Sequence, residues 1–251
     1  MKKKNYIAEY VVAAGYIIFF CLASVFCLSF YYLTRSEKPP SAVNVFATNL
    51  PATTPVPHIT SIEKLGSSKV FEDNFSNNKN KWTIDQEGVQ EKVSGGKLLF
   101  ESRTEHEYAL VECSSCPYLK EPYYLQADFA TTAATAEGFG LVFNKSHIDY
   151  SFYLFQINTE TKTYYLFHRG KEDWSLCTAG ESAQIKSFPA TNTLGVYINL
   201  DTVELYINGR IVDSYQQSGY SFQSGYLGLL ASDSGFKLAV DNLSLHTTAG
   251  Q

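Results

Sequence analysis

The chain has 251 residues, and its 45% hydrophobic content is enough for a folded protein with a substantial core. Its net charge is −5, and no basic stripe interrupts this acidic balance, so nucleic acid is excluded as the expected partner. Aromatic residues make up 15% of the chain, mostly Tyr and Phe, and both residue types favour β-strands.

An uncharged, largely apolar run occupies residues 10–34. About 20 apolar residues are enough to cross a bilayer as a helix. Tyr10 begins the run, and Tyr31 and Tyr32 lie near its other end, where aromatic rings prefer the membrane–water interface. The run therefore predicts one transmembrane helix.

The charges around this run predict its orientation. Three lysines at positions 2–4 place the stronger positive charge on the N-terminal side, so residues 1–9 are expected to form a cytoplasmic tail. The rest of the chain is then held outside the cytoplasm by a single-pass anchor in the cell membrane. A cleaved signal peptide is the alternative, but its apolar core usually spans only about 7–15 residues.

Residues 35–66 form a predicted linker. Five prolines interrupt this segment, and Ser, Thr and Ala fill much of the space between them. Such a composition breaks helices and favours an extended, partly polyproline-like spacer. We expect the linker to lift the following domain off the membrane.

Five cysteines divide between the apolar run and the outer domain. Cys113, Cys116 and Cys177 lie in the outer domain, so one thiol is left over if a disulfide forms. The pair Cys113 and Cys116 could close a local bridge, or one of them could reach Cys177. A redox or zinc site is disfavoured because the flanks of the pair look like strands and convincing further ligands are missing.

Residues 67–248 are predicted to form one all-β domain. Short β-rich runs alternate with turn signals throughout, and this many antiparallel strands should fold as a sandwich of two packed sheets. The expected strands are 69–75, 82–86, 89–93, 97–102, 107–112, 123–131, 138–144, 151–157, 163–169, 183–187, 194–200, 203–208, 211–215, 225–231 and 236–246.

Several of these runs show local detail. Alternation in 123–130 and 203–208 predicts that one strand face is buried and the other faces water. Asn208-Gly209 matches a type I′ hairpin turn. A switch in the parity of the apolar residues predicts a β-bulge at Asp241-Asn242.

Four segments together resemble one known family. Residues 70–75, followed by Lys81-Trp82, are similar to the opening strand of concanavalin A-like lectin and glucanase jelly rolls. Residues 203–210 (VELYINGR) resemble a laminin G-like hairpin, while 225–229 and 239–245 resemble the closing strands. Taken together, the four segments resemble bacterial domains of the 3-keto-disaccharide hydrolase, or family-sixteen-like glycosidase, type. This resemblance implies a two-sheet jelly roll that often binds sugar and is sometimes a glycosidase.

A catalytic site is not predicted. The related glycosidases carry their acids on one strand as Glu-x-Asp-x-x-Glu, and no such string occurs here. Glu105 and Glu107 would share a strand face, but a solvated edge is the simpler interpretation. Some relatives hold a structural calcium near strand ends. Lone acidic turn residues are common, so no cofactor is predicted at Asp73, Asp201, Asp233 or Asp241.

A binding site is predicted in the aromatic stretch from Tyr150 to Trp174. Sugar faces stack on flat aromatic rings while polar groups satisfy the hydroxyls. About half of the rings in a hairpin must belong to the core, and Trp174 either forms an exposed platform or caps the sandwich edge. The predicted ligand-binding residues are Trp174, Tyr153, Tyr165, Gln156, His168 and Arg169.

The sequence thus predicts a membrane-anchored, non-enzymatic module that binds glycan or another cell-envelope ligand. One alternative is a hydrolase that uses paired carboxylates on the concave sheet. The other is a protein-interaction domain of a membrane complex. An exposed aromatic flanked by amides favours the first function, convergent carboxylates favour the second, and a flat apolar patch favours the third.

Overall fold

The computed structural model describes residues 68–83, 89–102, 108–120, 122–131, 138–171, 173–218, 222, 224–232 and 237–247. The predicted tail, transmembrane segment and linker at residues 1–66 lie outside this part of the chain. Within it, no helix is long and apolar enough to cross a membrane. The described part is all-β, as predicted.

The strands follow the order of the chain. Their bounds are β1 Ser68–Asp73, β2 Trp82–Thr83, β3 Val89–Val93, β4 Leu98–Ser102, β5 Tyr108–Cys113, β6 Tyr123–Thr131, β7 Phe139–Lys145, β8 Phe152–Asn158, β9 Thr163–Arg169, β10 Trp174–Glu181, β11 Asn192–Asn199, β12 Thr202–Ile207, β13 Arg210–Gln216, β14 Tyr226–Ser232 and β15 Lys237–Thr247.

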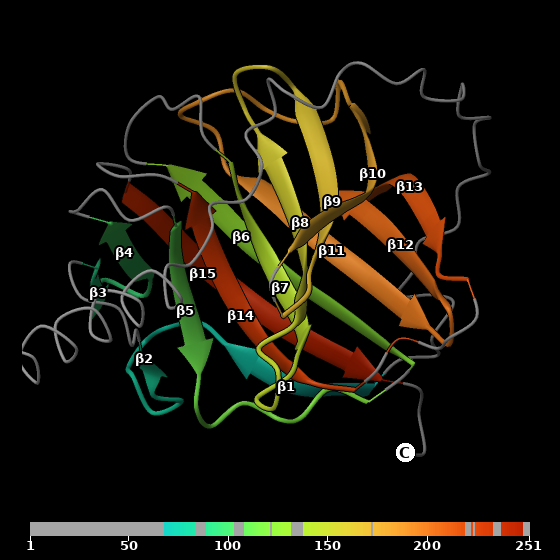
Figure 1. The fold of residues 1–251 in the computed structure, drawn as a ribbon. Helices are drawn as coiled ribbons and strands as arrows, with labels where there is room; N and C mark the ends of the chain where they lie inside the picture. The colour runs from blue at the N-terminus through green and yellow to red at the C-terminus, as the bar shows by residue number, and fades with distance from the viewer. Residues whose placement is uncertain are drawn as a thin grey trace, which may run out of the picture. The chain divides into compact units, whose positions relative to one another are not determined.

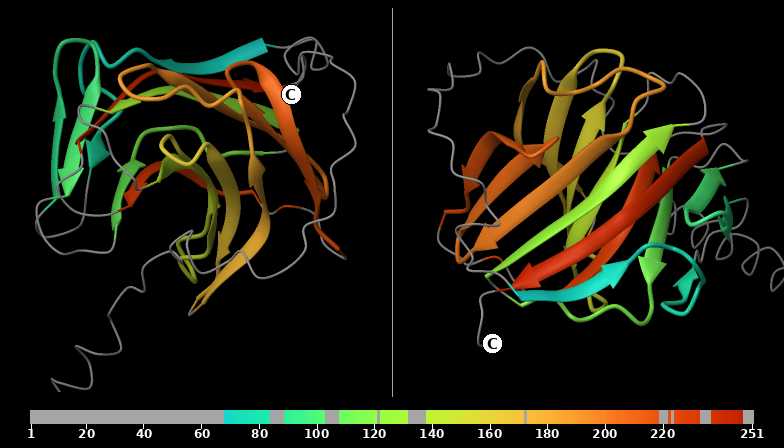
Figure 2. Two further views of the ribbon diagram at one scale, coloured as in Figure 1. Left: turned by 90° about the horizontal axis from the view of Figure 1, so that it is seen from above. Right: turned by 180° about the vertical axis from the view of Figure 1, so that it is seen from behind.

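These strands form two antiparallel sheets packed face to face (Figure 1). The eight-stranded sheet has the order β13-β12-β11-β6-β15-β4-β3, with β1 pairing on β15. The seven-stranded sheet has the order β10-β9-β8-β7-β14-β5-β2. Figure 2 shows the two layers one above the other, and the predicted two-sheet antiparallel sandwich is confirmed.

The main core lies between the sheets and follows the alternation of the sequence. On β6, Tyr123, Leu125 and Phe129 point inward and are fully buried. Burying one large apolar side chain stabilises the fold by about 1.5–3 kcal/mol. Such inward faces, repeated on both sheets, are what hold the sandwich together.

The prediction that the opposite face of β6 and β12 meets water is wrong at two positions. Tyr124 and Tyr206 are only 3% and 2% exposed, and their rings meet edge to face at 5.7 Å. The neighbouring Gly195 leaves the room for this contact, because a Cβ there would lie 2.3 Å from the Tyr124 hydroxyl. A small aromatic cluster therefore covers part of the outer face of the eight-stranded sheet.

The turn and bulge predictions are confirmed by the backbone. Asn208 and Gly209 have φ values of 51° and 78°, as a type I′ turn requires at both central positions. The pairing of β15 with β6 shifts register between Asp241 and Ser244, and Asn242 has a φ of 51°. A bulge therefore lies where the apolar parity changes.

One predicted strand is wrong. Residues 183–187 form a turn region instead of a strand, in which the backbone N–H of Lys186 donates to the Asn192 side chain. The edge strand next to β9 is β10, Trp174–Glu181, which is not among the expected strands. A register shift between Leu176 and Thr178 breaks its alternation.

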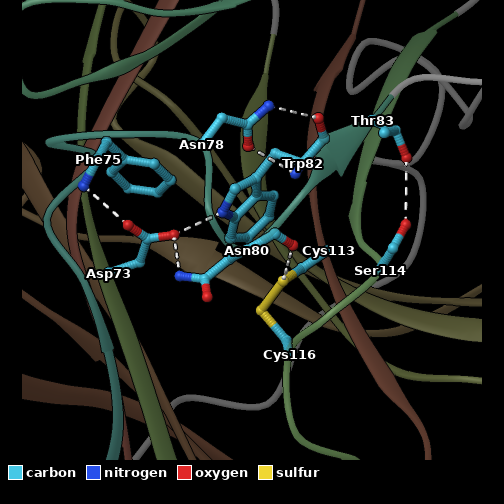
Figure 3. Close-up of a disulfide and its surroundings, with 9 residues drawn as sticks. All are labelled: Asp73, Phe75, Asn78, Asn80, Trp82, Thr83, Cys113, Ser114 and Cys116. Carbon is cyan, nitrogen blue, oxygen red and sulfur yellow. Dashed lines mark hydrogen bonds between the residues drawn. A yellow bond between two sulfur atoms is a disulfide. The ribbon is translucent and has the colours of Figure 1, made fainter.

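A buried polar corner ties β1 and β2 to β5 (Figure 3). The carboxylate of Asp73 accepts hydrogen bonds from the backbone N–H of Phe75 at 2.8 Å and from Asn80 Nδ2 and Trp82 Nε1, each at 2.7 Å. A disulfide joins Cys113 to Cys116 beside this cluster. The corner fixes how the start of the domain is attached to the second sheet.

Candidate functional site

The outer face of the seven-stranded sheet is strongly concave (Figure 2, left). Four strands separate β5 from β10 in this sheet. In a flat sheet the two would lie roughly 24 Å apart. The rings of Tyr108 on β5 and Trp174 on β10 nevertheless lie 6.1 Å apart between centroids. The sheet therefore curls around this outer face, which is called the curved face below.

Apolar side chains fill the centre of the curved face. They come from alternate positions of neighbouring strands, and the buried ones are Tyr108, Val142, Phe152, Leu154, Tyr165, Phe167 and Leu230. Trp174 is partly buried and meets Phe152 and Phe167 edge to face at 5.5 and 6.0 Å. The floor is therefore an aromatic and aliphatic layer, with Trp174 at its rim.

Polar groups lie at two places on the same face: Arg169 beside Trp174, and Tyr165 beside Gln156. The guanidinium of Arg169 lies over the Trp174 ring, 5.6 Å from its centroid, and its Nη1 makes no hydrogen bond within the described structure. The hydroxyl of Tyr165 is likewise buried without a hydrogen-bond partner there. Gln156 pairs with Tyr165 across the strands, and its Oε1 accepts from Ser232 Oγ at 3.2 Å. The two unpartnered atoms are buried beneath the surface of the curved face.

The six predicted ligand-binding residues divide between two faces. Trp174, Tyr165, Gln156 and Arg169 lie on the curved face, as the register of β8, β9 and β10 requires.

Tyr153 and His168 point toward the interior. Tyr153 belongs to the main core, its ring lies 4.7 Å from that of His168, and its hydroxyl donates to Gln217 Oε1 at 2.8 Å. Burial raises the pKa of Tyr153 well above its ordinary value. On geometry, only the four residues on the curved face share one surface.

The position of His168 leads to a pH prediction. Burial lowers the pKa of its imidazole below the ordinary value of 6.5, with a smaller opposing effect from Asp149. The unfolded chain therefore binds this proton more readily than the folded chain. The contribution of His168 to the free energy of unfolding is fully present above about pH 6.5 and is lost as the pH falls below it. His168→Gln should therefore lose less unfolding free energy than the parent chain between pH 7.5 and 5. Denaturant titrations at both pH values test this, and equal losses would contradict it.

Tyr108 is a rim residue that the sequence analysis missed. It was expected at the start of a strand, but nothing in the chain indicated that β5 would meet β10 across the curved face. Tyr108 and Leu110 pack in the same apolar cluster. Their spacing of two residues is the one sequence feature that indicates that they share a face of the strand.

Carboxylates are scarce on the curved face. The central strands β7, β8, β9 and β14 contain no Asp or Glu. On β5, Glu112 is paired with Lys145 at 3.0 Å, and Glu181 ends β10 on the same face as Ala179 and Tyr165. Glu105 and Glu107 lie outside the described residues. Among the residues that are described, no group of three or more His, Cys, Asp or Glu side chains could hold a metal ion.

Cys177 is the remaining cysteine of the described part. It lies at the β10 register shift, partly buried against the main core. Burial raises the pKa of its thiol to about 11. The thiol is therefore protonated at neutral pH and is a poor nucleophile.

Solved structures share this architecture at low sequence identity. The carbohydrate-binding module CBM66 from Bacillus subtilis is 15% identical, covers 68% of this chain and 98% of its own, and gives a TM-score of 0.55. A Bacillus subtilis protein of unknown function with a galectin-like fold is 11% identical over 72% of this chain and 96% of its own, with a TM-score of 0.61.

The catalytic domain of an endo-1,3-beta-glucanase (laminarinase) from Thermotoga petrophila is 11% identical over 73% of this chain and 99% of its own, with a TM-score of 0.55. The described part of the chain has the fold of a concanavalin A-like β-sandwich. No protein-family model and no curated protein matches the sequence. This sandwich fold hosts both binding modules and glycanases, so function has to be argued from the residues.

Proposed function

We propose that the chain is a membrane-anchored module that presents its concanavalin A-like β-sandwich outside the cytoplasm and binds glycan without hydrolysing it. The observation that carries the proposal is the rim of the curved face, where the partly buried Trp174 lies against Arg169. A flat ring beside a hydrogen-bond donor is the combination that recognises a sugar ring and its hydroxyls.

The fold supports a glycan as the ligand class. One structural neighbour is a carbohydrate-binding module, and others are glucanases. The curved face holds aromatic and aliphatic side chains together with buried polar atoms of Arg169 and Tyr165. A pyranose ring is itself amphipathic, with C–H faces for the floor and hydroxyls for the polar atoms.

The sequence of the curved face supports a non-enzymatic role. Glycoside hydrolysis generally needs two carboxyl groups, roughly 5–10 Å apart, on either side of the scissile bond. The four central strands supply none. On the flanking strands, Glu112 is paired with Lys145, and Glu181 lies at the end of β10. Binding is therefore the simpler use of this surface.

The membrane part of the proposal rests on the N-terminal sequence. The uncharged run at residues 10–34 is long enough for a spanning helix, and the lysines before it favour a cytoplasmic N-terminus. The Pro-rich residues 35–66 supply a spacer.

Loss of binding in Trp174→Ala is the expected outcome of a glycan array probed with the full chain in detergent. Removing one stacking ring should weaken binding at least about tenfold, and Trp174→Phe should retain part of it. Tyr118→Ala removes an aromatic that is 47% exposed outside the curved face and is the matched control. Absence of binding to every sugar, or equal binding by all variants, would contradict the proposed function.

A further inference from the structure

Large apolar side chains are exposed mainly at one end of the sandwich. Among the described residues, six such side chains are markedly exposed: Val70 48%, Tyr118 47%, Ile148 95%, Tyr150 68%, Phe188 41% and Leu200 64%. Scattered singly, they would need no explanation. The register of the strands shows that five of them belong to one end.

Tyr123, the first residue of β6, defines this end. It pairs with Ile198 near the end of β11, and the exposed Leu200 follows two residues later. It also pairs with Thr247, which in turn pairs with Ser68 at the start of β1. Val70 is two residues further along β1. Leu200, Ser68 and Val70 are therefore neighbours of the Tyr123 end.

The other sheet contributes the remaining exposed groups at this end. The Tyr123 hydroxyl donates to Asn144 Oδ1 at 2.7 Å, and the β7–β8 turn that carries Ile148 and Tyr150 follows directly. Next to this turn, the rings of Tyr118 and His147 lie 5.0 and 4.1 Å from that of Tyr226. These connections lie along the lower edge of the sandwich in Figure 1.

Phe188 marks the opposite end. It precedes Asn192, the first residue of β11, whereas Leu200 follows the last. Among the described residues, exposed apolar groups are therefore unevenly distributed along the strand direction, and Phe188 provides an internal reference for experiments.

The chemistry of the Tyr123 end fits a bilayer interface. Tyrosine rings prefer the headgroup region, and an aliphatic side chain at a turn tip can enter the acyl boundary. The Nζ of Lys145 lies 5.3 Å from the centre of the Tyr150 ring and also pairs with Glu112, while Asp149 accepts hydrogen bonds from Ser151. Lys69 pairs with Glu72 beside Val70, and Asp201 next to Leu200 accepts from Gln216, so charges of both signs lie at this end. Such a mixture suits a zwitterionic surface better than an anionic one.

The end at which the chain enters the domain favours the membrane as the partner. Ser68 begins the described domain at this same end, and the segment before it carries the apolar run at residues 10–34. We infer that the Tyr123 end rests in the interfacial region of the bilayer that holds the chain's own N-terminal run, with Ile148 and Tyr150 inserted. This inference depends on the membrane part of the proposed function and extends it to the orientation of the domain. It replaces the expectation that the linker at residues 35–66 holds the domain off the membrane.

The test places a tryptophan at each end of the full chain in phosphatidylcholine vesicles. Ile148→Trp reports on the Tyr123 end, and Phe188→Trp is the matched control. Lipids brominated on the acyl chain quench only nearby rings, and the parent chain supplies the background from Trp82 and Trp174. We expect at least threefold more lipid quenching at position 148 than at 188, and at least threefold less quenching by aqueous iodide.

Vesicle flotation distinguishes a wrong domain orientation from a wrong membrane anchor. If the chain floats with the vesicles but position 148 is quenched by iodide as readily as position 188, the inference is overturned and the anchor stands. If the chain does not float, both the inference and the membrane part of the proposed function are overturned. Lipid quenching confined to position 148 supports the inference.

Discussion

Replacing Asp73 with alanine is expected to lower the free energy of unfolding by about 3–5 kcal/mol. The carboxylate is 3% exposed and accepts three hydrogen bonds, from Phe75 N, Asn80 Nδ2 and Trp82 Nε1. Its removal leaves these donors without their acceptor, among them the indole of a fully buried tryptophan. The loss should exceed that of an ordinary surface substitution several-fold.

Denaturant unfolding of the full chain in detergent, followed by tryptophan fluorescence, measures this effect. Asp173→Ala removes an exposed carboxylate and should change the free energy of unfolding by no more than about 0.5 kcal/mol. Asp73→Asn keeps the size of the side chain and one accepting oxygen, but its N–H₂ group must face at least one of the three donors, so its loss should fall between those of the other two variants. A loss below 1 kcal/mol in Asp73→Ala would show that the corner relaxes at little cost.

Gly140→Ala should be as damaging, or prevent folding altogether. An added Cβ would lie 1.8 Å from the backbone oxygen of Phe155, so the β7 and β8 backbones would have to separate. Since β7 and β8 are central strands of the curved sheet, the expected loss is about 4 kcal/mol or more. The methyl group itself is small, and the damage comes from the displacement of paired backbone.

Gly170→Ala is the matched control for this substitution. Its added Cβ would meet only the carbonyl oxygen of Asp173 at 3.6 Å, which is an ordinary contact. Thermal unfolding of both variants should show a large drop in midpoint temperature for position 140 and a change of a few degrees at most for position 170. Similar midpoints would mean that the β7–β8 contact adjusts freely.

Local patterns predicted most of the fold. Alternation on β6 and the Asn208-Gly209 turn are properties of neighbouring residues, so they are readable before the chain folds. The β10 strand was missed because its buried and exposed positions do not alternate through the register shift at Cys177. Tyr124 and Tyr206 were expected at the surface because the space above Gly195 that brings them together exists only after three strands have paired.

The candidate site was only partly predictable for the same reason. The aromatic density between Tyr150 and Trp174 drew attention to β8 and β9, but parity alone did not say which side of the sheet was the interior. That choice placed Tyr153 and His168 with the predicted ligand-binding residues, although they face the core. The contact of Trp174 with Tyr108 depends on curvature summed over a whole sheet, which no short segment encodes.

The pairing of β1 with β15 has a mechanical consequence. Ser68 lies opposite Thr247, and β1 then runs along β15 to Asp73. Tension along the linker at residues 35–66 would pull on Ser68 and separate β1 from β15 one residue pair at a time. The force would then act on each backbone hydrogen bond in turn. The Asp73 corner is where such unzipping would stall. A force ramp applied through the N-terminal segment should therefore show a stepwise opening, and Asp73→Ala should remove its last step.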